Sequence, residues 1–213
     1  ISVISPLFYK EEKVNKLGIF MNFWEKNWDA DHIKYINKAA DIGFDVLEFQ
    51  AQPLLEMSDA RLTEIKSAAD RRGIELTYSL GLDPKYDISS EDESVRCGGV
   101  KYLSQIMDRV KKIDGKIISG VSYAGWGVTI GSRKQQMLEQ SIKSMRELVK
   151  AAEDYGITYC VEAVNRFESA LLNTSAEAVE YVKRVDSPAI GVLLDTFHMN
   201  IEENNIGDAI RYA

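Results

Sequence analysis

The sequence is short of the residues that mark several classes of protein. Only two cysteines, Cys97 and Cys160, occur among the 213 residues. Because their spacing does not pair them, we expect a reduced, cytoplasmic protein without a disulfide framework. No apolar run approaches the roughly 18 residues that a membrane-spanning helix needs. The 26 basic residues are outnumbered by 33 acidic ones, for a formal net charge of −7. Such a surface repels phosphate, so we expect neither a nucleic acid nor a membrane as partner.

The chain also lacks any linker rich in proline or serine, so a single large core is expected. What it does contain is a recurring local pattern. Residues 39–50, 68–80 and 151–163 each join the end of a helix to a β-rich run through a glycine. Glycine suits the left-handed conformation that commonly ends a helix. The repeated unit is therefore helix, glycine and strand.

Extending this pattern along the chain predicts six strands that alternate with helices. The strands are expected at 17–23, 44–50, 74–80, 116–122, 157–163 and 190–196. The helices are expected at 30–42, 58–72, 91–112, 133–155 and 174–185, and a further helix begins at 206. Ser58 can cap the second helix, and Thr174 with Glu177 forms a capping box at the fifth. Near-continuous apolar strands between helices indicate a parallel sheet that is covered on both faces.

Two α/β architectures fit this alternation, an open doubly wound sheet and a (β/α)8 barrel. The first strand runs into LGIFMNFWEKNW (17–28), which has no glycine-rich phosphate loop, so a nucleotide-binding Rossmann unit is disfavoured. Polar groups at the ends of several strands favour the barrel. We therefore expect a TIM-barrel type fold with about six βα units over residues 17–213, preceded by an N-terminal extension at 1–16.

Three carboxylates lie at the ends of predicted strands, namely those of Glu48, Glu162 and Asp195. For Glu48, an ordinary solvated carboxylate remains an equal alternative. Glu162 and Asp195 each follow at least four mainly apolar residues, and neighbouring strands would bring them close together. Adjacent buried carboxylates repel each other unless they share a proton or a cation. A divalent metal with oxygen ligands is the natural solution.

Further candidate residues flank these carboxylates. His198 follows the aspartate by three residues, and Glu168 lies six residues after the glutamate of the fifth strand. A histidine in a βα loop is commonly a packing residue, but its place beside an expected metal ligand favours a functional role. His32, in the first predicted helix, is taken as structural. Trp126, between two glycines after the fourth strand, suits the apolar wall of a sugar site.

The segments around these residues resemble the D-tagatose/D-psicose (allulose) 3-epimerase family, which belongs to the xylose-isomerase-like barrel superfamily. The resemblance rests on VEAVNRFESALLNT (161–174) and VLLDTFHMNIEE (192–203), and it extends from about Leu17 to the last residue. It also includes Phe23, Trp24, Glu25 and Trp28 of the opening, GFDVLE at 43–48, ISSED at 88–92 and the Trp126 loop.

This resemblance implies a metal-dependent ketose 3-epimerase, acting on pairs such as D-fructose and D-psicose or D-tagatose and D-sorbose. In the family, two glutamates, an aspartate and a histidine hold Mn²⁺ or Co²⁺, and Glu162 and Asp195 match two of these ligands. Glu162 would also be catalytic, because one metal-bound glutamate removes the C3 proton to give an ene-diolate. A second glutamate returns a proton to the opposite face, which inverts the configuration at C3.

The resemblance also implies substrate-binding positions. His198 and Glu168 match residues that hydrogen-bond the O1–O2 end of the sugar. Phe20 and Trp126 match apolar pocket positions, and Phe20 stands where relatives often have tyrosine. Family members are dimers or tetramers, so we expect a homodimer or a homotetramer.

The family's barrel has eight strands, whereas six are predicted here. The resemblance implies that two further units, of roughly 60–80 residues, would supply the histidine ligand, the second catalytic glutamate and a substrate-binding arginine. One explanation, which we favour, is that the chain is part of a longer protein. The other is that the 213 residues are the whole product. In that case we expect no epimerase activity unless another chain completes the site.

Three rival functions stay open. A related barrel sugar isomerase, or a dehydratase acting on inosose-type substrates, would share the metal site. Endonuclease IV shares the superfamily fold but needs a histidine-rich zinc site and a DNA-binding surface, which two histidines and a net charge of −7 disfavour. A catalytically incomplete sugar-binding member of the family would bind no metal and would exchange no C3 proton.

Overall fold

Six parallel strands form one curved sheet in the computed structural model, which describes residues 15–28, 30–128 and 131–213. Apart from residues 15 and 16, the expected N-terminal extension at 1–16 lies outside the described residues. The strands are β1 (Gly18–Phe20), β2 (Val46–Gln50), β3 (Glu75–Leu82), β4 (Ile117–Gly125), β5 (Thr158–Ala163) and β6 (Ile190–Leu194). They pair in sequence order, and each neighbouring pair is parallel.

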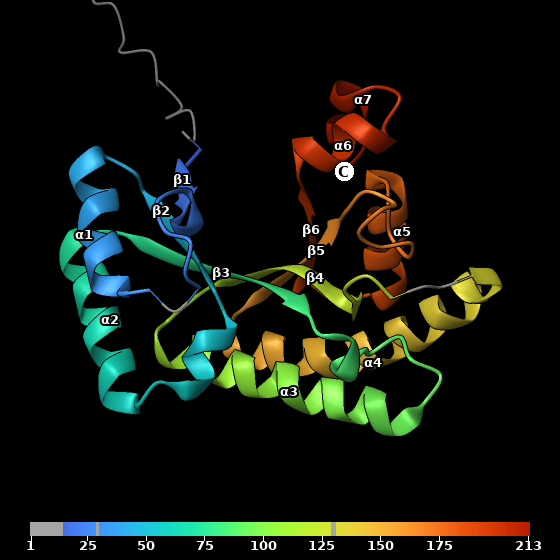
Figure 1. Cartoon of the computed structure of the whole chain (residues 1–213), viewed down its shortest axis with the longest axis horizontal. Coiled ribbons are helices and arrows are strands. Elements are labelled where there is room, and N and C mark those ends of the chain that lie inside the picture. Colours follow the sequence, from blue (N-terminus) through green and yellow to red (C-terminus); the bar gives the residue numbers. More distant parts are fainter. Residues whose placement is uncertain (1–14, 29, 129–130) are drawn as a thin grey trace, which may run out of the picture.

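Helices connect the strands and lie outside the curved sheet (Figure 1). They are α1 (His32–Ile42), α2 (Asp59–Arg72), α3 (Glu93–Lys112), α4 (Lys134–Tyr155) and α5 (Ser175–Val185), with α6 (Thr196–Glu202) and α7 (Ile206–Tyr212) after β6. Short 3-10 helices occur at η1 (Met21–Phe23), η2 (Gln52–Glu56), η3 (Pro84–Tyr86) and η4 (Gly131–Arg133). The sheet curves from β1 at one end to β6 at the other, with β1 and β6 facing each other across the opening in Figure 1. This is a partial (β/α) barrel of the TIM type with six strands, as expected.

Local signals account for the ends of the helices. Gly43, Gly73 and Gly156 follow α1, α2 and α4 with φ angles of 100°, 66° and 65°, the left-handed conformation that glycine adopts without strain. Ser58 caps α2 through its side chain, and the capping box of Thr174 with the third helical residue opens α5. The predicted final residues of α1 to α5 are therefore the observed ones.

Four predicted strand ends are wrong: β3 and β4 continue beyond the predicted residues 80 and 122, to Leu82 and Gly125, and β1 and β6 end early. The first strand is only three residues long, because Met21–Phe23 turns into a 3-10 helix. The last strand ends at Leu194, and the next residue, Asp195, is the N-cap of α6. The Asp195 carboxylate accepts a hydrogen bond from the Phe197 backbone nitrogen at 2.8 Å, which satisfies a free donor of the first helical turn. The loop expected around His198 is therefore helical.

The core lies between the central strands and the long helices α3 and α4. Leu103 and Ile106 of α3 and Met145 and Leu148 of α4 are at most 1% exposed. His32, expected to be structural, is buried in α1 and stacks on Phe49 with ring centroids 3.9 Å apart. None of the helices in the described parts of the chain is both long and apolar enough to cross a bilayer.

Candidate active site

A cavity of about 1310 Å³ is lined by residues from all six strands. They include Phe20, Glu48, Ser79, Ser119, Glu162 and Leu193. Trp126 and Asp195 also line it, and each directly follows the C-terminal end of a strand. Barrels of this type carry their chemistry at that end of the sheet, because several loops converge there. The cavity is therefore the candidate active site.

The register of β5 and β6 places two carboxylates on one face of the sheet. Glu162 pairs with Leu193 across the two strands. Side chains alternate along a strand, so Leu193 and the residue two positions later, Asp195, point to the same side as Glu162. Both carboxylates line the cavity, as their position at neighbouring strand ends predicted.

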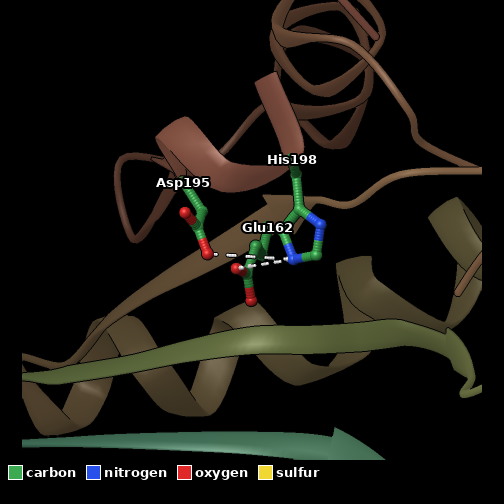
Figure 2. A group of neighbouring side chains, drawn as sticks. All are labelled: Glu162, Asp195 and His198. Atoms are coloured by element: carbon green, nitrogen blue, oxygen red, sulfur yellow. Dashed lines mark ion pairs between the residues drawn. The ribbon is translucent and has the colours of Figure 1, made fainter. Parts of the chain in front are cut away.

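His198 joins this pair from the first turn of α6. Its Nε2 atom lies 3.8 Å from Glu162 Oε1 and 3.8 Å from Asp195 Oδ2, as the dashed lines in Figure 2 show. Each of the three residues offers a ligand atom within 4.8 Å of those of the other two. The start of α6, with Asp195 as its N-cap, produces this arrangement, since residues three apart lie on the same side of a helical turn.

Electrostatics at this cluster favour a cation. Burial raises the pKa of Glu162 to about 7, and the negative charges of Asp195, Glu48 and Glu168 add to the shift. A divalent ion between the carboxylates would offset both the lost hydration and the mutual repulsion. Carboxylate oxygens and an imidazole are also suitable donors for divalent metals of the first transition row. The residues present therefore fit a bound metal ion.

Glu48 contributes a third carboxylate to the cavity. Burial raises its pKa, and hydrogen bonds from the hydroxyls of Ser79 and Ser119 partly oppose that shift. The Ser119 Oγ atom lies 3.4 Å from Glu48 Oε2. The sequence left an ordinary solvated carboxylate as an equal alternative for Glu48, whereas the structure places it among buried and cavity-lining groups.

The two aromatic residues expected to bind substrate lie on the cavity wall. Phe20 ends β1 and is half-buried, and Trp126 is 42% exposed. The indole of Trp126 packs directly over Gly81, where a Cβ atom would come within 2.5 Å of the ring. Glycine at that position therefore allows the tryptophan to lie against β3.

Glu168 and His198, the other two expected substrate-binding residues, lie beside the cavity and are not among its lining residues. Glu168 Oε1 lies 3.9 Å from His198 Nδ1 and accepts a hydrogen bond from Asn165 Nδ2 at 2.9 Å. Asn165 is 2% exposed and also contacts the His198 ring. Asn165 was not among the predicted site residues, because its partners are revealed only by the fold of the loop after β5.

Known proteins with this architecture resemble the chain over nearly its whole length. The sequence profile of the xylose isomerase-like TIM barrel family matches residues 36–213. The chain is 42% identical over 200 residues to the D-psicose 3-epimerase of Ruminiclostridium cellulolyticum, covering 93% of this chain and 68% of that protein. It is 39% identical over 200 residues to the D-psicose 3-epimerase of Agrobacterium fabrum, covering 93% of this chain and 69% of that protein.

Solved structures agree with the sequence similarity. A crystal structure of D-psicose 3-epimerase with D-tagatose, from Clostridium cellulolyticum H10, superposes with a TM-score of 0.89 at 41% identity. The superposition covers 92% of this chain and 69% of that one.

Fold, site and similarity together define a xylose isomerase-like TIM barrel. Within that class, the chain belongs to the ketose 3-epimerase family, whose members are carbohydrate isomerases. It spans about two thirds of the length of the relatives it matches.

Proposed function

We propose that the protein is a metal-dependent ketose 3-epimerase that interconverts free ketohexoses, such as D-fructose with D-psicose or D-tagatose with D-sorbose. The observation that carries this proposal is the cluster of Glu162, Asp195 and His198, two of which line the cavity, in a chain that belongs to this family. Residues 17–213 would form the part of the TIM-barrel epimerase-like domain that carries Glu162 and Asp195, and this domain would be incomplete at its C-terminal end. We also propose that it acts in the cytoplasm as a homodimer or homotetramer, as the resemblance to the family implies.

Glu162 would act as the base. Its carboxylate faces the cavity at the end of β5, where it can reach a sugar held against the strand ends. It would take the proton from C3, which is weakly acidic because it lies beside the C2 carbonyl, and hold it on a carboxylate oxygen. Inversion needs a proton delivered to the opposite face, so one carboxylate performs only half of the exchange. The second glutamate that the resemblance implies would perform the other half.

The remaining residues would bind and orient the sugar. Trp126 and Phe20 offer apolar surfaces to the C–H groups of the ketose. His198 and Glu168 would contact its O1–O2 end. Mn²⁺ or Co²⁺ held by Glu162 and Asp195 would supply Lewis acidity, which stabilises negative charge on the sugar oxygens by several kcal/mol.

The test measures hydrogen exchange and epimerisation together. The full gene product that carries these 213 residues is incubated in D₂O with Mn²⁺ and either D-fructose or D-tagatose. We expect deuterium at C3 and formation of the C3 epimer, both lost with EDTA and restored by Mn²⁺ or Co²⁺. Bound metal with isomerisation or dehydration in place of C3 exchange would overturn the proposal in favour of a related barrel enzyme. Neither bound metal nor exchange would identify a sugar-binding protein.

A further inference from the structure

The imidazole of His198 has two nitrogen atoms in different surroundings. Nε2 lies 3.8 Å from Glu162 Oε1 and from Asp195 Oδ2. Nδ1 lies on the other side of the ring, against Asn165. The backbone nitrogen of Asn165 donates to Nδ1 at 3.2 Å, and its side-chain Nδ2 lies 2.8 Å from the same atom. His198 and Asn165 are 6% and 2% exposed, so both contacts are shielded from solvent.

The orientation of the Asn165 amide follows from its other partners. Its Oδ1 atom accepts a hydrogen bond from the Phe167 backbone nitrogen at 3.0 Å. Its Nδ2 atom donates to Glu168 Oε1 at 2.9 Å. A flipped amide would lose the first bond and would place a carbonyl oxygen against a carboxylate. The NH₂ group is therefore the one that faces His198.

Nδ1 of His198 thus meets two N–H donors, one from the backbone and one from the side chain of the same residue. A proton on Nδ1 would point at both donors, so this atom must present its lone pair. The ring proton then resides on Nε2. We propose that Asn165 is a positioning residue that holds His198 in the Nε2–H tautomer, so that the imidazole donates a hydrogen bond into the carboxylate site instead of binding a metal ion.

This tautomer distinguishes between two roles of His198 that the geometry of the cluster leaves open, metal ligand and hydrogen-bond donor. As a metal ligand, Nε2 would need its lone pair, and the proton would have to move to Nδ1, where Asn165 opposes it. As a donor, Nε2–H is too far from either carboxylate for a good hydrogen bond at 3.8 Å, so an oxygen of a bound molecule can accept it. The identity of that oxygen as one of a ketose rests on the proposed function, whereas the tautomer does not.

The tautomer is directly measurable in the full gene product. Long-range ¹H–¹⁵N correlation spectra of the ¹⁵N-labelled protein without metal report which ring nitrogen carries the proton. A His198→Gln variant identifies the His198 signals as those that disappear. We expect His198 to show a protonated Nε2 and an unprotonated Nδ1. A protonated Nδ1 in the wild-type chain would overturn the proposal.

Two substitutions test whether Asn165 is the cause. Asn165→Asp replaces the amide donor with an acceptor, so we expect Nδ1 to become protonated. Asn165→Ala keeps the backbone donor, so we expect a mixture of the two tautomers. Asn200→Asp makes the same chemical change at an exposed position of α6, the helix that carries His198, and should leave the wild-type pattern intact. An unchanged pattern in folded Asn165→Asp and Asn165→Ala chains would show that Asn165 does not hold the tautomer.

Measurements of epimerase activity distinguish a failure of this proposal from a failure of the proposed function. In the full gene product with Mn²⁺, we expect Asn165→Asp to lower kcat/KM for epimerisation at least about tenfold, which corresponds to the loss of one hydrogen bond to substrate. Asn200→Asp should stay within about twofold. If the wild-type protein epimerises no ketose, the proposed function fails, but the spectra still decide the tautomer. Full activity in an Asn165→Asp protein whose tautomer has switched would overturn the role assigned to His198.

Discussion

Two strands of the same sheet, β4 and β6, differ in how deeply they are buried. Eight of the nine residues of β4 are buried, but only Ile190 of the five in β6 is. β4 pairs with strands on both sides and lies over α4, whereas β6 pairs with β5 alone among the described residues. The well-covered strand contributes apolar side chains to the core. The less covered strand leads into Asp195 and the site.

Within the described residues, the two strands show a division between packing and chemistry, since β4 lies in the core and β6 leads into the site. Close packing around β4 stabilises the fold, because each buried methylene there is enclosed by neighbours. At the ends of β5 and β6, the half-buried carboxylates of Glu162 and Asp195 repel each other. Both line the cavity, where a metal ion and a sugar could reach them. Substitutions near β4 should therefore reduce stability, and substitutions of the carboxylates should reduce activity at little cost in stability.

The largest effect is expected for Glu162→Gln. The amide cannot take the C3 proton, so epimerisation by the full gene product should fall at least about 10³-fold. The free energy of unfolding in urea, measured without metal, should stay level or rise, because a neutral amide relieves the repulsion around Glu162. Glu147→Gln, at an exposed position of α4, is the matched control and should change neither quantity. Retained activity in Glu162→Gln would contradict the division.

A glycine in each strand provides the next test. Gly120 of β4 has a φ of 110°, and a Cβ atom there would lie 2.3 Å from the Leu80 carbonyl oxygen. We expect Gly120→Ala to lower the free energy of unfolding by about 4 kcal/mol, through backbone strain and this clash. At Gly191 of β6, the nearest neighbour of a Cβ atom would be Cys160 Sγ, at 3.6 Å.

Gly191→Ala should therefore cost less than about 1 kcal/mol. Urea unfolding of both variants measures the difference. Equal losses at the two positions would show that β6 is as tightly packed as β4.

The apolar side chains of β4 and β6 differ in burial in the same way. Ile118 of β4 is 0% exposed, whereas Leu193 of β6 is half-buried and lines the cavity. Ile118→Ala should cost about 3 kcal/mol, since it leaves a hole in a close-packed region. Leu193→Ala should cost about 1 kcal/mol, because it only widens an existing cavity. Thermal or urea unfolding gives both values, and a larger loss for Leu193→Ala would reverse the assignment.

A small effect is also expected at the ion pair of Arg166 and Glu202, which holds the end of α6. Glu202 accepts hydrogen bonds from the Arg166 backbone and guanidinium, and these interactions lower the pKa of Glu202 to about 2 from an ordinary value of 4.5. The stabilisation is fully present above about pH 4.5 and is lost as the pH falls towards 2. Because Arg166 is exposed to solvent, we expect only about 1 kcal/mol.

The measurement is the difference in unfolding free energy between the wild type and Glu202→Gln across this pH range. The difference should be about 1 kcal/mol at neutral pH and should shrink as Glu202 becomes protonated. A difference that does not depend on pH would show that the ion pair does not stabilise α6.

Local chemistry made much of the fold predictable. The glycines after α1, α2 and α4 and the capping box of Thr174 act within a few residues of the chain, so they can be recognised in a sequence. The proximity of Glu162 and Asp195 was also predictable, because the carboxyl ends of neighbouring parallel strands lie at the same edge of a sheet.

Two features of the site were not predicted from the sequence. Asp195 was expected to extend a strand and instead caps α6, since its carboxylate bonds to the backbone two residues later only when the chain turns there. Asn165 was not singled out at all.

The sequence alone determined the order of the six strands and of α1 to α5, the final residues of those helices and the two neighbouring carboxylates. Each of these follows from residues close together in the chain or from the regular geometry of a parallel sheet. Only the tertiary structure decided how His198 is held. Its partner Asn165 lies 33 residues away in the chain, and two hydrogen bonds to one ring nitrogen arise only when the loop after β5 packs against α6.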